Sequence, residues 1–341
     1  MATVLSTPTK LRTRKIGNHE VSAMGWGAMN LSVGYGPAPP DEERYKLLDD
    51  ICERGVNFWD TADCYGDNEV VIGEWFKRTG KRDDVFLATK FGLFSTPDRF
   101  VNGTPEYVRQ AVEKSLKRLG IETIDLLYYH RPDPTVPIEK TVTAMAEFVK
   151  EGKVRYLGLS ECSADTLRRA HAVHPITAIE VEYSALVQDI EDPKIGLLQA
   201  ANELGVTVVA YSPLGRGVLT GQIKGPEDFS SEDFRLMIGR LSKENFPNIL
   251  KVVDALKRVG DRQGATTAQA ALAWVLAQGD NIIPIPGSTK IKRVEENIGA
   301  LKVKITEEEV CEVRELAANT THGDRYPGYL MDVQFGDTPS V

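Results

Sequence analysis

The chain has 341 residues, of which 42% are hydrophobic and 26% are charged, as is ordinary for a soluble globular protein. The formal net charge of −8 argues against a surface that binds nucleic acid or an anionic membrane. No run of about 18 apolar residues occurs, so no transmembrane helix is expected. Residues 1–10 lack the apolar stretch of a secretory signal.

Four cysteines are spread along the chain without any Cys-x-x-Cys pair: Cys52, Cys64, Cys162 and Cys311. This spacing is typical of reduced thiols and argues against a disulfide framework or a zinc site. His171 and His174 have no third ligand in view, so we interpret them as solvated surface residues. We therefore expect a cytoplasmic protein without a bound metal.

The first half of the chain alternates apolar runs with helical patterns, after a hairpin over 12–23 that turns at Asn18 and His19. In chain order we predict a strand at 21–26, a helix at 41–53, a strand at 56–60, a helix at 67–77, a strand at 85–90, a helix at 104–119 and a strand at 124–130. Asp41 is the expected N-cap of its helix. Thr104 is the expected cap of the helix that Pro105 begins.

The second half continues the alternation. We predict a helix at 137–150, a strand at 154–159, a helix at 163–172, a strand at 178–181, a helix at 192–203 and a strand at 206–211. After a connection over 213–243, helices at 244–262 and 266–277 precede a strand at 282–285, and helices at 290–298 and 306–317 follow it. The connection is longer than ordinary loops, so we expect it to have a function.

The eight predicted strands are mostly continuously apolar, which is typical of parallel strands covered on both faces. Eight strand–helix units favour a closed (β/α)8 TIM barrel over an open doubly wound sheet. The glycines at 25 and 27 do not form the Gly-x-Gly-x-x-Gly motif of dinucleotide-binding sheets. We expect one domain over 1–341, with the N-terminal hairpin, the barrel over about 14–317 and a polar tail over 318–341.

Ionisable side chains stand at the carboxyl ends of three successive predicted strands. Asp60 ends the second strand, Lys90 the third and His130 the fourth, and Tyr65 lies five residues after Asp60. In a (β/α)8 barrel these strand ends meet at the rim where the chemistry takes place. A buried ion pair of Asp60 with Lys90 could be purely structural, but four such residues at one rim indicate a catalytic site.

Tyr65 becomes a useful proton donor beside a cation, because a free phenol has a pKa of about 10. Lys90 at ~4 Å, with an effective dielectric near 20, would favour the phenolate by on the order of 4 kcal/mol, or up to ~3 pKa units before desolvation opposes it. We therefore expect Lys90 to lower the pKa of Tyr65. Asp60 would keep Lys90 charged, and His130 would position a substrate oxygen.

The same four residues match the best-known signature of the aldo-keto reductases, which the chain resembles over nearly its whole length. The resemblance implies NADPH-dependent reduction of an aldehyde or ketone to the alcohol. In that reaction the nicotinamide supplies the hydride and Tyr65 the proton, while Lys90 and Asp60 tune Tyr65 and His130 orients the carbonyl. A small-molecule carbonyl compound is therefore the expected partner.

Residues 210–221 and 285–297 resemble the family's cofactor-binding segments. The resemblance implies Tyr211 against the nicotinamide; Ser212, Leu214 and Gly217 along the pyrophosphate; Ser288, Lys290 and Arg293 at the 2′-phosphate; and Glu296 and Asn297 at the adenine. A helix N-terminus with two added cations suits a phosphate and favours NADPH over NADH. The other interpretation of Lys290 and Arg293 is a pair of solvated surface charges.

Two positions depart from the family pattern. Many members have Ser-Asn after the fifth strand and Gln on the sixth, where both bind the nicotinamide carboxamide. This chain has Ser160-Glu161 and Glu180. An ionised carboxylate only accepts hydrogen bonds, so it could bind the amide NH2 but not the amide oxygen. Ser160 could still bind that oxygen, and the roles of both glutamates stay open.

Further candidates for the substrate pocket, with core or rim packing as the alternative, are Trp26, Met29, Phe91, Arg131 and the tail aromatics Tyr326, Tyr329 and Phe335. Cys64 adjoins Tyr65, and we interpret it as a small buried side chain rather than a redox centre.

The resemblance leaves the substrate, the reaction direction and the oligomeric state open. Residues 158–161 and 181–184 are similar to a branch that includes pyridoxal reductases, so pyridoxal and broad aryl or alkyl aldehydes are both candidates. A cofactor-sensing regulatory barrel with little turnover would keep the same four residues. A Schiff-base aldolase that uses Lys90 would not need NADPH.

Overall fold

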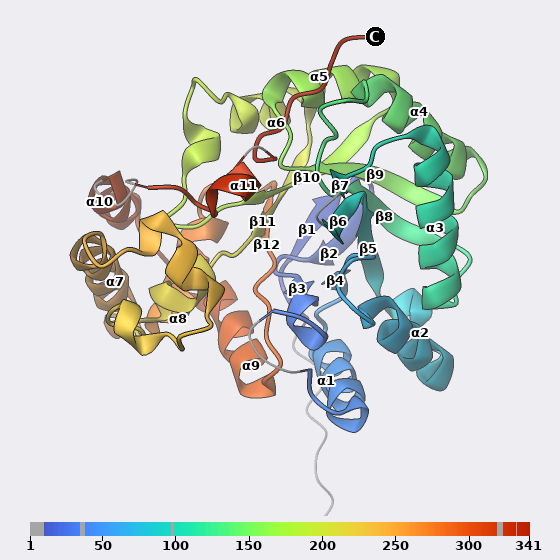
Figure 1. Ribbon diagram of the computed structural model, residues 1–341. Coiled ribbons are helices and arrows are strands. Elements are labelled where there is room, and N and C mark those ends of the chain that lie inside the picture. Colours follow the sequence, from blue (N-terminus) through green and yellow to red (C-terminus); the bar gives the residue numbers. More distant parts are fainter. Residues whose placement is uncertain (1–9, 35–37, 97–98, 319–322, 332) are drawn as a thin grey trace, which may run out of the picture.

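Parallel strands form the centre of the molecule and are surrounded by helices (Figure 1). The computed structural model describes residues 10–34, 38–96, 99–318, 323–331 and 333–341. In this part of the chain, eight strands pair in the order β3-β4-β5-β8-β9-β10-β11-β12. Their bounds are Trp26–Gly27, Phe58–Asp60, Phe86–Phe91, Ile124–Tyr129, Val154–Ser160, Ile176–Glu182, Thr207–Tyr211 and Ile282–Pro284.

The two edge strands of this sheet meet, so that the sheet curls into a barrel. The Gly25 N–H donates to the Pro284 carbonyl at 3.0 Å, and Gly27 forms a parallel bridge with Gly287. Side chains fill the interior, as in other small barrels. They come from several strands: Phe58, Phe86, Leu126, Tyr128, Ala178, Val209 and Ile283.

Helices that follow the strands cover the outside of the barrel. They are α1 (Asp41–Glu53), α2 (Asn68–Thr79), α3 (Pro105–Leu119), α4 (Ile138–Lys150), α5 (Ala164–Val173), α6 (Leu197–Leu204), α7 (Phe246–Asp261), α8 (Thr267–Leu276), α9 (Ile291–Gly299) and α10 (Glu307–Ala317). In α4, Ile138, Val142 and Met145 form a buried stripe at helical spacing. No helix in the described ranges is long and apolar enough to cross a membrane.

The N-terminal hairpin closes the end of the barrel opposite the strand carboxyl ends. β1 (Thr13–Ile16) pairs antiparallel with β2 (His19–Ser22), as the sequence predicts. Ile16 and Val21 are fully buried and pack with Phe58 and Phe86 of the barrel interior. The open end of the barrel is therefore the carboxyl end, where the candidate catalytic residues stand.

Several predicted boundaries are wrong for local reasons. The strand expected at 21–26 divides, since Val21 belongs to the hairpin and only Trp26–Gly27 joins the barrel. The helix expected at 192–203 begins at Leu197, because Gly196 takes a left-handed conformation with φ of +63°. The N-cap of α1 is Pro40, and Asp41 is the first helical residue. Thr104 stands at the N-cap of α3, but its hydroxyl donates to Asn102 rather than capping.

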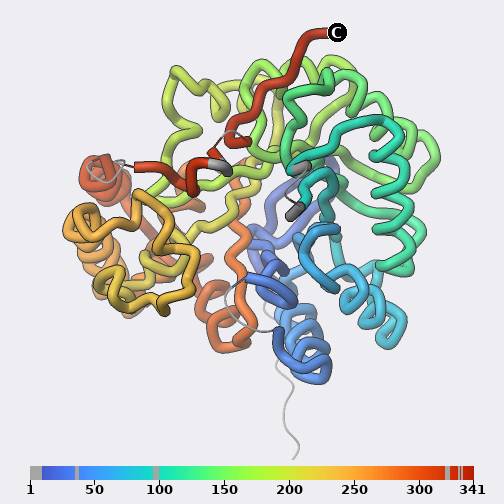
Figure 2. The backbone as a smooth tube through the Cα atoms, viewed as in Figure 1, coloured from blue at the N-terminus to red at the C-terminus, as the bar shows by residue number. Residues whose placement is uncertain are grey.

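Segments without a predicted structure cover the carboxyl end. The connection at 213–243 contains the 3-10 helices η4 (Gly215–Thr220), η5 (Pro226–Asp228), η6 (Phe234–Met237) and η7 (Gly239–Leu241). The strands β6 (Leu93–Thr96) and β7 (Arg99–Val101) follow β5, and the helix α11 (Gly328–Met331) belongs to the tail. The described tail segments, 323–331 and 333–341, run across the barrel toward α5 (Figures 1 and 2). There Arg169 of α5 donates to the Thr338 carbonyl at 2.8 Å. Both segments therefore border the candidate site.

Candidate active site

A cleft of about 790 Å³ opens at the carboxyl end of the barrel. Its volume is in the range typical of small-molecule sites. Asp60, Tyr65, His130, Glu180 and Tyr211 line it, and all five lie at strand ends or on the loops that follow. The structure thus brings residues from four separate parts of the sequence to one cavity.

Lys90 lies beneath this cleft with a fully buried side chain. Its ammonium forms an ion pair with Asp60, donates to the Thr61 carbonyl at 2.9 Å and lies 3.3 Å from Glu180 Oε2. Burial alone would lower the pKa of Lys90, but Asp60 and Glu180 outweigh burial and raise that pKa above its ordinary value. Lys90 is therefore a cation throughout the physiological pH range.

Tyr65 lies beside both Lys90 and His130. Its ring meets the His130 ring edge to face, with centroids 5.8 Å apart, and Lys90 Nζ is 5.2 Å from the Tyr65 ring centroid. The expected lowering of the Tyr65 pKa is wrong, since burial raises this pKa and outweighs Lys90. A negative charge on Asp60, or on Glu180 once it has lost its proton, also opposes Lys90. Tyr65 is therefore a neutral phenol at neutral pH.

His130 is a neutral imidazole. Burial first, and then Arg131 and Lys90, lower its pKa well below the ordinary value. Cys64 Sγ lies 3.6 Å from His130 Nδ1, and a thiol that donates there leaves the ring proton on Nε2. Burial and then Asp63 raise the pKa of Cys64 to about 12. The thiol is thus unreactive, which agrees with the absence of a redox role, although Cys64 is only partly buried.

Glu161 is engaged by the C-terminal tail. Its carboxylate accepts hydrogen bonds from Arg325 at 3.0 Å, from the Tyr211 hydroxyl at 2.8 Å and from the Glu182 backbone at 3.0 Å. Burial alone would raise the pKa of Glu161, but Arg325 and then Arg131 outweigh burial and lower it to about 2. Glu161 does not line the cleft, so the carboxylate holds the tail in place. Ser160 accepts from Arg131 at 2.9 Å.

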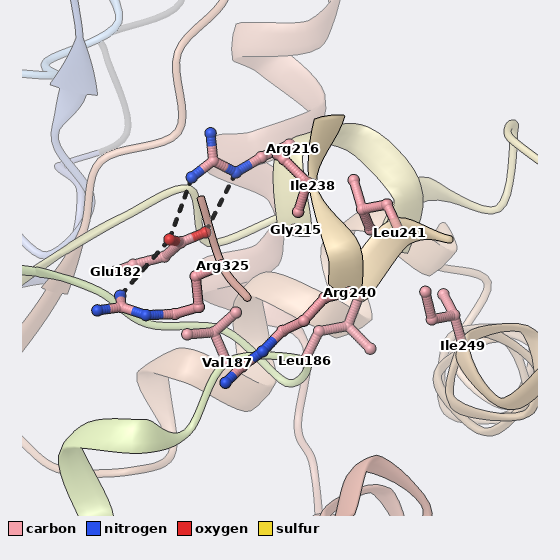
Figure 3. Close-up of a pocket in the computed structure, with 10 residues that line it drawn as sticks. All are labelled: Glu182, Leu186, Val187, Gly215, Arg216, Ile238, Arg240, Leu241, Ile249 and Arg325. Carbon is pink, nitrogen blue, oxygen red and sulfur yellow. Dashed lines mark hydrogen bonds and ion pairs between the residues drawn. The ribbon is translucent and has the colours of Figure 1, made fainter. Parts of the chain in front are cut away.

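A second buried carboxylate joins the tail to the connection after β11. Glu182 pairs with Arg216 at 3.1 Å and with Arg325 at 3.6 Å. Figure 3 shows both guanidinium groups pointing toward this carboxylate. The Tyr326 hydroxyl lies 3.0 Å from the Tyr211 hydroxyl. We call Glu161, Glu182, Arg216 and Arg325 the tail clasp.

The sequence reasoning did not identify the tail clasp. A signal was present, because Glu161 and Glu182 are charged residues at the ends of two apolar strands. Buried carboxylates require cationic partners. The identity of those partners depends on Arg325, which lies 164 residues beyond Glu161.

Most residues expected to hold a dinucleotide lie along one side of the cleft. Tyr211, Ser212, Leu214, Gly217, Ser288, Arg293, Glu296 and Asn297 line it. Lys290 does not; it is exposed at the N-cap of α9. In the described residues neither Lys290 nor Arg293 has an ion-pair partner. Two unpaired cations at a helix N-terminus beside a cleft fit a phosphate group.

The candidate substrate residues divide into two groups. Met29 and Arg131 line the cleft. Trp26 is 2% exposed and packs against Trp59, and Phe91 is fully buried and stacks on Tyr129, so both belong to the core. Of the tail aromatics, Tyr326 also lines the cleft and Phe335 does not, while the Tyr329 side chain lies outside the described residues. Further lining comes from residues that the sequence did not indicate, among them Leu93, Phe100 and Gln334.

A sequence model of the Aldo/keto reductase family matches residues 23–318. The chain belongs to the aldo/keto reductase family. Aldo-keto reductase str7 from Strobilurus tenacellus is 58% identical over 337 residues, covering 97% of this chain and 99% of the relative. A Schizosaccharomyces pombe aldo-keto reductase, yakc, whose name carries the qualifier NADP(+), is 47% identical over 335 residues, covering 96% and 98%.

Solved structures of the family share the barrel. A glycerol dehydrogenase from Gluconobacter oxydans superposes with a TM-score of 0.81 at 27% identity, over 91% of this chain and 96% of that chain. A thermostable aldo-keto reductase bound to the inhibitor epalrestat superposes with a TM-score of 0.72 at 30% identity, over 90% and 100%. The (β/α)8 fold expected from the sequence is confirmed, and family membership makes the chain an oxidoreductase that acts on carbonyl groups.

Proposed function

We propose that the protein reduces an aldehyde or ketone to the alcohol with NADPH as the hydride source. The observation that carries this proposal is a neutral phenol, Tyr65, at the cleft with the buried cation Lys90 behind it. Such a pair delivers a proton to a carbonyl oxygen and stabilises the phenolate that remains. The qualifier in the name of the S. pombe relative also supports NADPH.

The cofactor fits the side of the cleft between β11 and α9. Ser288, Lys290 and Arg293 would hold the 2′-phosphate, and Tyr211 would lie against the nicotinamide. The cofactor supplies a hydride when it is bound. Ser212, Leu214 and Gly217 would border the pyrophosphate, and Glu296 and Asn297 the adenine. Ser160 keeps its hydroxyl proton free to donate to the carboxamide.

The residues of the chain supply the proton and orient the substrate. Tyr65 donates its phenolic proton to the carbonyl oxygen. Lys90 stabilises the resulting phenolate, and Asp60 keeps the ammonium in place. His130, neutral and buried, donates a hydrogen bond that orients the carbonyl. In the direction of alcohol oxidation, Tyr65 acts as the base.

The lining favours aryl and alkyl aldehydes over a single polar substrate. Met29, Leu93 and Phe100 give the cleft part of its apolar lining, and Arg131, Tyr326 and Gln334 are among its polar lining residues. Pyridoxal carries a ring nitrogen and hydroxyl groups that would need several polar partners. We therefore place broad aldehydes first and pyridoxal second.

Lys90 is a poor candidate for a Schiff-base lysine. A Schiff base requires a neutral amine, and the buried ion pair with Asp60 keeps this amine protonated. Borohydride should not trap a carbonyl substrate on Lys90.

The test is NADPH consumption with a panel of aryl and alkyl aldehydes and pyridoxal. The proposal predicts many turnovers per enzyme, with several panel members accepted. Consumption of only one equivalent of NADPH per protein, for every compound, would instead support a cofactor-sensing regulatory barrel.

A further inference from the structure

Three ionisable groups are buried together behind Tyr65. The side chains of Lys90, Asp60 and Glu180 are 0%, 3% and 5% exposed. Both carboxyl groups contact the one ammonium, so the cluster would carry a net charge of −1 if both were ionised. Burial of an uncompensated charge is costly, and a carboxyl group in that position takes up a proton instead.

The oxygen atoms of the cluster indicate where that proton lies. Asp60 Oδ1 is paired with Lys90. Asp60 Oδ2 and Glu180 Oε2 are buried acceptors that no donor within the described residues reaches in hydrogen-bond geometry. Both carboxyl groups nevertheless contact the same ammonium, so they are buried neighbours. A hydrogen bond between two carboxyl groups requires that one of them be protonated.

Glu180 is the better proton carrier of the two. Asp60 has the closer contact with Lys90, whereas Glu180 lies 3.3 Å away. Burial, and then the Asp60 charge, raise the pKa of Glu180 well above its ordinary value. The groups that face Glu180 are Asp60 from β4, Lys90 from β5, Tyr128 from β8 and Tyr65 from the loop after β4. Its partners on β9 and β11 are the uncharged Ser160 and Val209.

We propose that Glu180 is a positioning residue that carries a proton at neutral pH and shares it with Asp60. The cluster then holds one anion and one cation, and the Lys90 charge remains available to Tyr65. When Glu180 loses its proton, a second anion next to Lys90 opposes formation of the Tyr65 phenolate. The consequence for the reaction rate rests on the proposed function, whereas the protonation itself does not.

The direct test is infrared spectroscopy of the cofactor-free protein. A neutral carboxylic acid has a carbonyl stretching band that a carboxylate lacks. The native minus Glu180→Gln difference spectrum should contain such a band. Asp125→Asn is the matched control, because Asp125 is buried but paired with Arg82 at 2.7 Å. Its difference spectrum should show loss of a carboxylate band only.

Isotope labelling keeps the test valid if Glu180→Gln does not fold. In native protein with ¹³C-labelled glutamate the acid band should shift, and labelling of aspartate should leave this band in place. A spectrum without a glutamate-dependent acid band at neutral pH would overturn the proposal. Because the measurement needs no turnover, it is independent of whether the protein reduces carbonyls.

Kinetic measurements distinguish a positioning role of Glu180 from a role in packing alone. Tyr65 and Lys90 have pKa values raised above their ordinary values of 10.0 and 10.5. Both groups therefore lose their protons only at strongly alkaline pH. The native enzyme should lose activity as the pH rises, at a pH below that at which Tyr65 and Lys90 lose their protons. This loss should occur at the pH where the infrared acid band disappears. Glu180→Gln should keep kcat at pH 7 within about tenfold and lack this loss. An unchanged pH profile in the variant would overturn the positioning role.

Discussion

At the scale of single residues, the site depends on a competition between burial and charge. Burial raises the pKa of Tyr65, and the Lys90 cation only partly offsets it. The phenol therefore keeps its proton until a substrate oxygen becomes basic during hydride transfer. Lys90 matters most after the proton has left, because it then faces a phenolate.

Removal of the Lys90 cation should strongly reduce catalysis. In Lys90→Met we expect kcat to fall by about 10²–10⁴-fold, because no cation would stabilise the phenolate. The thermal midpoint should also fall, since Asp60 loses its buried partner. Steady-state kinetics and thermal unfolding measure these two effects. Lys77→Met, at a side chain that is 79% exposed, is the control, and equal behaviour of the two variants would contradict this role.

Asp63 should make stability depend on pH. Burial and then Glu69 raise its pKa from 3.8 to about 7, so the folded state binds the proton more tightly than the unfolded state. Its contribution to stability is therefore favourable below pH 3.8 and is lost as the pH rises through about 7. Asp63→Asn should raise the thermal midpoint by a few degrees at pH 8 and give no gain at pH 4. An equal gain at both values would show that ionisation is not the cause.

At the scale of elements, the tail and the connection after β11 are joined by buried charges. Arg325 contacts both Glu161 and Glu182, and Glu182 also pairs with Arg216. Arg216 is next to Gly217, which we propose borders the pyrophosphate, in the connection over 213–243. The tail clasp should therefore slow the opening of that segment.

Arg325→Met should release the tail clasp. The change leaves Glu161 without its main partner, and breaking a buried pair in this way is destabilising. We expect NADPH to dissociate about tenfold faster in stopped-flow fluorescence, together with faster proteolysis in the tail. Arg258→Met removes an exposed ion pair with Glu312 and serves as the control. Native dissociation rates in Arg325→Met would show that the clasp does not hold the connection.

The elements also show how far sequence reasoning extends. Strand positions and the four signature residues followed from apolar runs and their polar ends, which are local features. The tail clasp did not, because it depends on a meeting of Arg325 with strands far away in the sequence. The predicted direction of the Tyr65 pKa shift was wrong for a related reason. Desolvation depends on packing around the phenol, which the spacing of Asp60 and Tyr65 does not describe.

At the scale of the whole molecule, the barrel provides a rigid rim and the covering segments complete the cleft. The cleft is lined both by strand ends such as Asp60 and by residues of the covering segments such as Phe100, Phe234 and Tyr326. Rigid elements position reacting groups more accurately than loops do. Substrate preference should therefore change with the loops and the tail, while the proton-donating group stays the same.

The preference for NADPH over NADH should depend on the cations at the start of α9. Arg293→Ala should weaken NADPH binding by about 10–100-fold, since a charge-assisted contact to the 2′-phosphate is lost, and leave NADH binding nearly unchanged. Fluorescence titration of both cofactors measures the two affinities. Equal losses for the two cofactors would mean that Arg293 does not recognise the phosphate.

The most direct test of the central claim compares native protein with Tyr65→Phe. The measurement is NADPH oxidation with one accepted aldehyde, together with fluorescence titration of NADPH binding. We predict that the variant binds NADPH with native affinity while kcat falls by at least about 10²-fold, because the ring remains and only the proton is absent. Full turnover by Tyr65→Phe would contradict the account.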